Sequence, residues 1–234
     1  MGIIQKIKRS KDAKTLAANF IYLSLLKGIS FIFPLITLPY LARVIGPDSF
    51  GAIAFATSIM VIIETITDWG FNFTATRDVA QNREDIKIVS QIFSQVLYAR
   101  ILLMIICFVL MMIVIESVPS LHEYRLLLIL TFLYIPGHIL FPQWLFQAFE
   151  RMRYITILTL IANAVFTGLV FIVIREQSDY VYQPLLTACG FIASGIIAQY
   201  IIYHSFKVRL QRPSLHHIYI RSVSYTHLRA HETV

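Results

Sequence analysis

The chain contains several long apolar runs that hold no Asp, Glu, Lys or Arg. The clearest are Leu126 to Phe149, Tyr154 to Ile174 and Tyr180 to Phe206. A helix needs roughly 20 apolar residues to cross the hydrocarbon core of a bilayer, so each run is long enough to span it. Charged residues make up 14% of the chain, whereas a typical soluble domain carries about 25%. The sequence therefore predicts an all-α integral membrane protein.

We expect a bundle of about six transmembrane helices, because hydropathy separates that number of apolar segments. The expected spans lie near Leu16–Ala42, Phe50–Asp68, Ser90–Ile115, Leu121–Phe141, Tyr154–Ile174 and Val181–His204. An even number of spans puts both chain ends on one side of the membrane.

Basic residues predict which side that is. At one end of the expected bundle, the loops and termini hold Lys6, Lys8, Arg9, Lys11, Lys14, Arg77, Arg83, Lys87, Arg151, Arg153, Lys207, Arg209, Arg212 and Arg221. The opposite end holds only Arg43, Arg125 and Arg175. Because cytoplasmic loops are enriched in Lys and Arg, both chain ends are predicted to be cytoplasmic.

The junction of the first two spans carries two prolines, Pro34 and Pro39, followed by the pair Gly46-Pro47. Proline inside a helix removes a backbone hydrogen bond and bends the helix. The freed backbone groups cannot be satisfied by lipid, so such a helix normally lines a cavity or another helix. This pattern favours a transport-type bundle with a turn at Gly46-Pro47.

Lys27 lies about 16 Å into the first span, at the ~1.5 Å rise of a helix. Asn19, Ser30 and Thr37 share its helix face. A charged side chain at this depth costs roughly 2.5–3.5 kcal/mol on insertion scales, which marks it as a functional candidate. We expect this polar stripe to face the bundle interior; the alternative is a lysine that snorkels to the interface.

Glu64 and Asp68 share one face of the second span. We expect them either to form pairs, for example Glu64 with Lys27, or to bind a coupling ion. A pair would lower the insertion cost of both charges. The alternative is that the two carboxylates reach the cytoplasmic headgroups, which is the interpretation we favour for Asp68 beside Trp69.

Two arginines near the cytoplasmic side are candidates for a gate or a surface role. Arg77 follows the second span in a segment, residues 69–80, that has the character of a short amphipathic helix. Arg100 lies either inside the third span or at its cytoplasmic boundary, depending on where that span begins.

Other functional classes find little support in the sequence. The net charge of +7 comes from residues at helix ends rather than from one face, which argues against nucleic-acid binding. Cys107 and Cys189 lie inside apolar runs and are expected to be buried thiols. The histidines are scattered, with His216-His217 the only adjacent pair. We expect no metal site, no cofactor and no enzymatic activity.

The chain divides into residues 1–221, which carry the transmembrane pattern, and residues 222–234, which do not. Ser222 to Val234 has no apolar period. It has the character of a translated sequencing artefact, and we exclude it from functional reasoning as one would a fusion scar.

Several ordered motifs resemble one known family. They are Phe33-Pro-Leu-Ile-Thr-Leu-Pro-Tyr-Leu-Ala-Arg, Gly46-Pro-Asp-Ser-Phe-Gly, Asp68-Trp-Gly-Phe-Asn, Ala75-Thr-Arg-Asp-Val-Ala and Trp144-Leu-Phe-Gln-Ala-Phe-Glu-Arg-Met. They are similar to the N-terminal half of polysaccharide biosynthesis flippases of the Wzx, O-antigen type, in the multidrug/oligosaccharidyl-lipid/polysaccharide exporter superfamily.

The resemblance implies one lobe of a two-lobe exporter in the bacterial inner membrane. Such proteins flip oligosaccharides linked to undecaprenyl diphosphate for O-antigen, capsule or exopolysaccharide export. Cationic cavity residues are thought to hold the diphosphate, and Lys27 is the best-placed candidate here. The implied partners are the bilayer, the lipid-linked glycan, a C-terminal lobe and a polysaccharide polymerase. Because the chain stops after about six spans, we expect a truncated protein that is not competent alone.

Two alternatives remain open. A membrane-embedded transferase would need convergent acid, base or metal groups, which the sequence does not show. A non-transporting scaffold module of the export machinery would need a docking surface. Gly190 and Ser194 form a small-xxx-small pair that could serve as such a surface or could pack helices within the chain.

Overall fold

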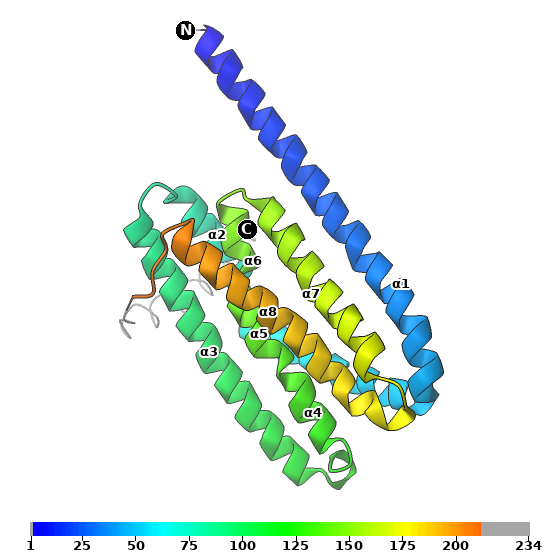
Figure 1. The fold of residues 1–234 in the computed structure, drawn as a ribbon. Coiled ribbons are helices and arrows are strands. Elements are labelled where there is room, and N and C mark those ends of the chain that lie inside the picture. The colour runs from blue at the N-terminus through cyan, green and yellow to red at the C-terminus, as the bar shows by residue number, and fades with distance from the viewer. Residues whose placement is uncertain (1, 212–234) are drawn as a thin grey trace, which may run out of the picture.

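A computed structural model describes the backbone of residues 2–211, and the side chains of residues 20–22, 24, 25, 28 and 31–211. Within this part of the chain every regular element is helical (Figure 1). The α-helices are α1 (Gly2–Asp68), α2 (Phe71–Gln81), α3 (Ile86–Ser117), α4 (Arg125–Phe132), α5 (Tyr134–Leu140), α6 (Gln143–Ala148), α7 (Met152–Val173) and α8 (Tyr182–His204). Two short 3-10 helices, η1 (Pro119–Leu121) and η2 (Gln177–Val181), precede α4 and α8.

Helix α1 is broken at Gly46. This residue has φ 76° and ψ 169°, a backbone region that is essentially restricted to glycine. At this point the chain turns back on itself (Figure 1), so α1 consists of a first arm, residues 2–45, and a second arm, residues 47–68. The predicted turn at Gly46-Pro47 is confirmed. The dihedral angles of Pro34 and Pro39 stay helical, so the break is made by the glycine.

Five stretches of the described chain are long and apolar enough to cross a membrane. They are Phe31–Gln81, Ile86–Ser117, Arg125–Ala148, Met152–Val173 and Gln177–His204. The first contains the break at Gly46 and so includes parts of both predicted N-terminal spans. The chain is thus an all-α, multi-pass membrane protein, as the sequence predicts.

The predicted span near Leu121–Phe141 corresponds to the stretch Arg125–Ala148, which is interrupted inside. The structure divides the predicted span into η1, α4 and α5, with Leu133 between the two α-helices. Pro136 explains the interruption, because its ring excludes the carbonyl of the residue four positions earlier and it has no N–H to donate. That earlier residue is Phe132, the last residue of α4.

The first arm of α1 runs parallel to α7 (Figure 1). Near the start of α7, the hydroxyl of Thr156 donates a 2.9 Å hydrogen bond to the carbonyl oxygen of Tyr22. Just after its end, the carbonyl oxygen of Ile174 accepts a 2.7 Å hydrogen bond from the Tyr40 hydroxyl. Both contacts join residues 134 positions apart, so the two helices keep one register over this length.

The buried apolar side chains form two clusters. One includes Leu41, Ile45, Met111 and Ile174 and lies toward the end with the Gly46 break. The other includes Phe93, Trp144, Leu145 and Val208 and lies toward the end with α2 and α6. Along α3, Val96 belongs to the second cluster and Cys107 to the first, which leaves Arg100 between them. Charged groups therefore meet where the two apolar clusters adjoin.

Small residues hold α7 against α8. A side chain on Gly190 would place its Cβ 2.5 Å from the Ala162 carbonyl oxygen, so only glycine fits here. Ser194 is fully buried and donates a 2.8 Å hydrogen bond to the Leu158 carbonyl oxygen. The small-xxx-small pair thus packs helices within the chain and does not form a docking surface.

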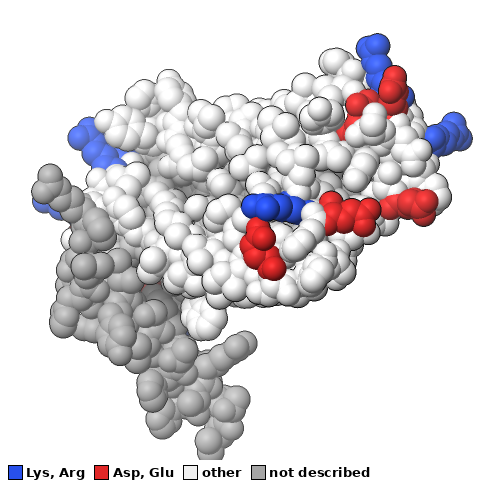
Figure 2. Space-filling view, turned by 90° about the horizontal axis from the view of Figure 1, so that it is seen from below, with Lys and Arg blue, Asp and Glu red and all other residues white. Residues whose placement is uncertain are grey.

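The end of the bundle with η1 and η2 is seen from below in Figure 2. In this view acidic and basic side chains gather near the middle and toward the right of the molecule, with further basic side chains at the left edge, and the rest of the face is largely uncharged. Arg125 and Glu116 form an exposed 3.0 Å ion pair at this end.

The prediction that both cysteines are buried is confirmed only for Cys107, because Cys189 is exposed. Residues 222–234, predicted to be a foreign tail, lie outside the described residues.

Candidate functional site

Charged and polar side chains from four helices meet inside the bundle. Glu64 and Asp68 lie one turn apart on the second arm of α1, so they share a face. Residues Trp69 and Gly70 then turn the chain into α2 with φ values of 38° and 76°. This turn brings Asn72 back, and its side-chain amide donates a 2.6 Å hydrogen bond to Asp68 Oδ2. Arg100 from α3 and His138 from α5 complete the group, which we call the ionic network.

Arg100 forms an ion pair with Asp68 through its Nη2 atom. The arginine is 2% exposed, and the side chain of Asp68 is 19% exposed. Nε of Arg100 is buried and has no hydrogen-bond partner among the described residues. Burying two charges is expensive even when they pair, so this contact fixes the relative positions of α1 and α3 rather than simply adding stability.

His138 connects Arg100 to Glu64. Its Nδ1 lies 3.2 Å from Arg100 Nη2, and its Nε2 lies 3.2 Å from Glu64 Oε1. A guanidinium can only donate, so Nδ1 must accept. The remaining proton is then on Nε2, which donates to the Glu64 carboxylate. These two hydrogen bonds together require the imidazole of His138 to be neutral.

The network therefore carries unequal charge. With both acidic groups ionised, Asp68 is balanced by Arg100, whereas the hydrogen-bond donors to Glu64 are two neutral groups, His138 and Tyr134. The side chains of Arg100 and His138 are only 3% and 14% exposed. Charged groups at membrane depth are costly and normally functional, so an unbalanced carboxylate identifies Glu64 as the most significant member.

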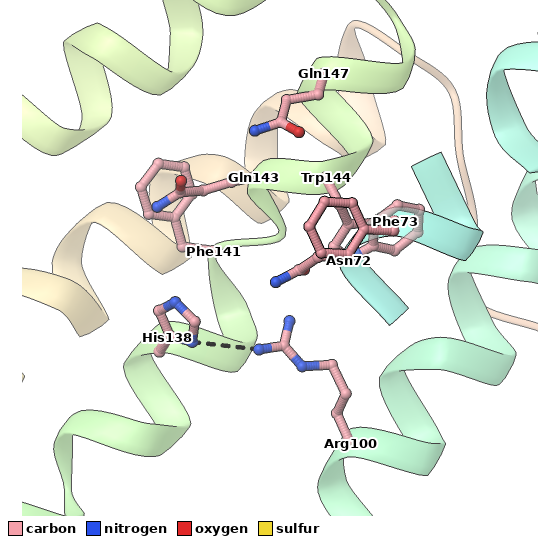
Figure 3. A pocket seen from close by; sticks show the side chains of 8 residues that line it. All are labelled: Asn72, Phe73, Arg100, His138, Phe141, Gln143, Trp144 and Gln147. Carbon is pink, nitrogen blue, oxygen red and sulfur yellow. Dashed lines mark hydrogen bonds between the residues drawn. The ribbon is translucent and has the colours of Figure 1, made fainter. Parts of the chain in front are cut away.

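Residues of the network line two pockets. The first has a volume of about 200 Å³ and is shown in Figure 3. Arg100 and His138 point toward each other at its floor, and amide side chains of α2 and α6 lie above them. Its lining residues are Asn72, Phe73, Arg100, His138, Phe141, Gln143, Trp144 and Gln147.

The second pocket has a volume of about 270 Å³. It lies between the second arm of α1, helices α4 and α5, and α8, and Glu64 contributes to its wall. The lining residues are Thr57, Met60, Val61, Glu64, Thr131, Tyr134, Gln183, Pro184, Thr187 and Phe191. The ionic network thus separates an amide-rich pocket from a largely apolar one.

Ligand atoms of Glu64, Asp68 and His138 lie within 4.8 Å of one another, a spacing that could hold a metal ion. In the present arrangement both ring nitrogens of His138 are engaged, Nδ1 with Arg100 and Nε2 with Glu64. A metal would have to displace one of these contacts, because a ligating imidazole needs a free lone pair. The sequence prediction did not include this grouping.

The predicted polar stripe on α1 is described only in part. The side chains of Asn19, Lys27 and Ser30 lie outside the described residues. The Lys27 backbone lies between the two contacts of α1 with α7, at Tyr22 and Tyr40. Thr37 is 3% exposed and its hydroxyl donates a 3.0 Å hydrogen bond to the Phe33 carbonyl oxygen. The side of α1 that carries Thr37 therefore faces the bundle, but the hydroxyl proton of Thr37 is already donated to the Phe33 carbonyl oxygen.

The other predicted residues are found in different environments. Arg77 is exposed on α2, whose Phe71, Ala75 and Val79 are buried, so this helix has one inward apolar face. Arg100 is not a surface residue. Asp68 contacts Arg100 and Asn72, and its position at the headgroups stays a prediction. The described partners of Glu64 are His138 and Tyr134.

Sequence reasoning missed His138. It lies within the uncharged run from Leu126 to Phe149, where a single histidine gives no periodic signal. The available clue was its position, because an ionisable residue inside a span is a functional candidate by default.

Comparisons with known proteins identify relatives of the whole bundle. The model of a family described as "Polysaccharide biosynthesis protein" matches residues 16–227. A protein of Escherichia coli (strain K12) named "Putative O-antigen transporter" is 30% identical over 207 residues, which cover 87% of this chain and 49% of that protein. A Shigella dysenteriae protein of the same name is 31% identical over 186 residues, which cover 79% of this chain and 46% of the relative.

The chain thus spans about half the length of the curated relatives it matches. No solved structure matches it. The family match extends over most of the chain and includes every helix of the ionic network. On this evidence the chain belongs to the polysaccharide biosynthesis protein family.

Proposed function

We propose that the chain forms one lobe of a flippase that moves an oligosaccharide linked to undecaprenyl diphosphate across the bacterial inner membrane. The family match carries this proposal, because it covers residues 16–227. The relatives' names describe transport of O-antigen. These names describe transport rather than catalysis, and we propose no enzymatic step.

The proposed second lobe follows from the length comparison. Each curated relative is about twice as long as the region that this chain matches. Transporters of this general kind bind substrate between two repeats that move against each other. We propose that this lobe provides one wall of such a cavity, that another lobe provides the opposite wall, and that a polysaccharide polymerase accepts the exported glycan.

Lys27 is the proposed contact for the diphosphate. Its backbone lies along α7 between the Tyr22 and Tyr40 contacts, within the apolar length of the bundle. An ammonium group attracts a dense anion more strongly in a low-dielectric cavity than in water. Asn19, Ser30 and Thr37 share its predicted face and are proposed to assist. Arg77 is a proposed cytoplasmic surface contact, and Arg100 a proposed internal gate.

The proposal is tested with the full chain in nanodiscs and undecaprenyl diphosphate as the titrated probe. Lys27→Ala should weaken binding by about tenfold or more, which corresponds to ~1.4 kcal/mol or more. Lys27→Arg should retain part of the affinity, because charge is kept while geometry changes. Arg43→Ala, at an exposed position near the Gly46 break, is the matched control and should bind normally.

A second measurement tests where Lys27 lies. In a background of Cys107→Ser and Cys189→Ser, a Lys27→Cys variant should react with small water-soluble thiol reagents in membrane vesicles. Undecaprenyl diphosphate should slow that reaction. An unreactive thiol together with normal binding by Lys27→Ala would show that Lys27 is a packing or snorkelling residue, and the proposed role would be rejected.

A further inference from the structure

We propose that the second pocket binds a small organic monovalent cation, such as a quaternary ammonium or protonated amine group, through Glu64. This would be a binding activity separate from the proposed diphosphate site, because it lies between α1, α5 and α8 and attracts the opposite charge. The inference depends on charge balance, on the orientation of hydroxyl protons and on two aromatic rings.

Charge balance is the first argument. Among the described residues that line this pocket, Glu64 is the only one that carries a charge, and no Lys or Arg is among them. The guanidinium of Arg100 contacts Asp68 and lines the other pocket. The histidine bonded to Glu64 is neutral in this geometry. Arg100 interacts electrostatically with Glu64 as well as with Asp68, so one guanidinium serves two carboxylates. The carboxylate that lines the apolar pocket therefore still attracts positive charge.

The threonine hydroxyls give the second argument. Their protons are donated to carbonyl oxygens of their own helices: Thr57 to Ile53 at 2.8 Å, Thr131 to Leu127 at 2.6 Å and Thr187 to Gln183 at 3.2 Å. A hydroxyl that donates within its helix can offer only lone pairs to a ligand. The three threonine hydroxyls therefore present acceptors, which suit a cation. The amide of Gln183 donates to Thr187 Oγ1 at 3.4 Å and keeps a second N–H.

Aromatic rings give the third argument. Tyr134 and Phe191 form an edge-to-face pair with centroids 4.7 Å apart and ring planes at 80°. Aromatic faces attract ammonium groups, and the attraction is stronger where water is excluded from the contact. Met60, Val61 and Pro184 add apolar surface for N-methyl or methylene groups. A metal ion would instead need a nearly complete shell of oxygen ligands.

Size limits the ligand to a small group. The pocket volume of about 270 Å³ is just below the ~300–1,000 Å³ range of ligand sites. It can hold a compact ammonium group but not an oligosaccharide.

The test uses the purified full chain in detergent with choline as the probe and 3,3-dimethyl-1-butanol as its uncharged isostere. Titration calorimetry and the melting temperature are measured at constant sodium concentration. Choline should bind and raise the melting temperature, whereas the isostere should do neither. Glu64→Gln should weaken choline binding by about tenfold or more. Glu116→Gln changes an exposed carboxylate at the far end of the bundle and should leave binding unchanged.

Phe191→Leu provides a variant outside the ionic network and should also weaken choline binding while the protein stays folded. Equal binding of choline and its isostere would overturn the proposal. Normal choline binding by both the Glu64→Gln and the Phe191→Leu variants would also overturn the proposal. Binding of sodium that requires Glu64, without binding of choline, would identify an inorganic cation site instead. The diphosphate titration of Lys27 variants is unaffected by any of these outcomes.

Discussion

Arg100 in α3 forms a buried ion pair with Asp68 at the end of α1, 32 residues earlier in the chain. The pair lies where the two apolar clusters adjoin, and it continues through His138 to Glu64. Three helices are thereby connected through side chains that the bilayer could not solvate.

Removing one member of the pair should be costly. Arg100→Ala leaves Asp68 without its cation, and such losses typically destabilise a protein by about 3–5 kcal/mol. We expect a lower melting temperature and less folded protein in detergent, measured by fluorescence-detected size exclusion. The double variant Asp68→Asn, Arg100→Gln should recover part of the loss.

The matched control is the exposed pair of Arg125 and Glu116, whose side chains are 54% and 53% exposed. Arg125→Ala should cost about 1 kcal/mol or less, because water already screens this pair. Similar losses for Arg100→Ala and Arg125→Ala would contradict the buried network.

Gly190 should tolerate no side chain. A Cβ there would lie 2.5 Å from the Ala162 carbonyl oxygen, so Gly190→Ala should force α7 and α8 apart and cost about 1–3 kcal/mol. Gly168→Ala in α7 is the control, because no atom lies within 4 Å of the added carbon. That change should be neutral or stabilise the helix by up to about 1 kcal/mol. Thermal melting of both variants distinguishes the two effects.

Gly46 should be irreplaceable for conformational reasons rather than for lack of space. A Cβ added to this residue would lie no closer than 3.6 Å to a neighbouring atom, but the φ of 76° and ψ of 169° disfavour any side chain. Gly46→Ala should cost about 1–3 kcal/mol. Gly51→Ala, which meets no atom within 4 Å, should not reduce stability. Equal melting temperatures for the two variants would show that the break does not depend on this glycine.

Membrane orientation follows from the basic residues. A reporter fused after Arg221 should lie in the cytoplasm and one fused after Arg175 in the periplasm, because Lys and Arg favour the cytoplasmic side. Alkaline phosphatase, active only in the periplasm, and green fluorescent protein, fluorescent in the cytoplasm, give opposite signals at each site. The reverse pattern of signals would exclude the proposed topology.

Much of the architecture could be predicted because the hydropathy of a short segment is enough to identify a membrane-spanning helix. The uncharged runs predicted the spans that the structure shows as α7 and α8, and the pair Gly46-Pro47 predicted the turn in α1. The division between α4 and α5 was missed because the apolar run continues through Pro136. Hydropathy alone does not register the hydrogen bond that this proline removes.

The ionic network could be predicted only in part. Glu64, Asp68 and Arg100 are conspicuous in an apolar sequence, but their pairing depends on how α1, α3 and α5 pack. The sequence places Asp68 beside Trp69, which favours an interfacial position. The structure turns the chain at Gly70 and directs Asp68 toward Arg100. Tertiary contacts of this kind leave no trace in local periodicity.

The parallel register of α1 and α7 has a consequence for biosynthesis. The first arm is made early, but its hydrogen-bond partners at Thr156 and Ile174 follow 134 residues later. During translation at ~5–20 residues per second, this arm must wait several seconds or longer for its neighbour. Throughout that interval Tyr40 has no access to the Ile174 carbonyl oxygen. The arm is therefore the region where an insertion chaperone would have most time to act.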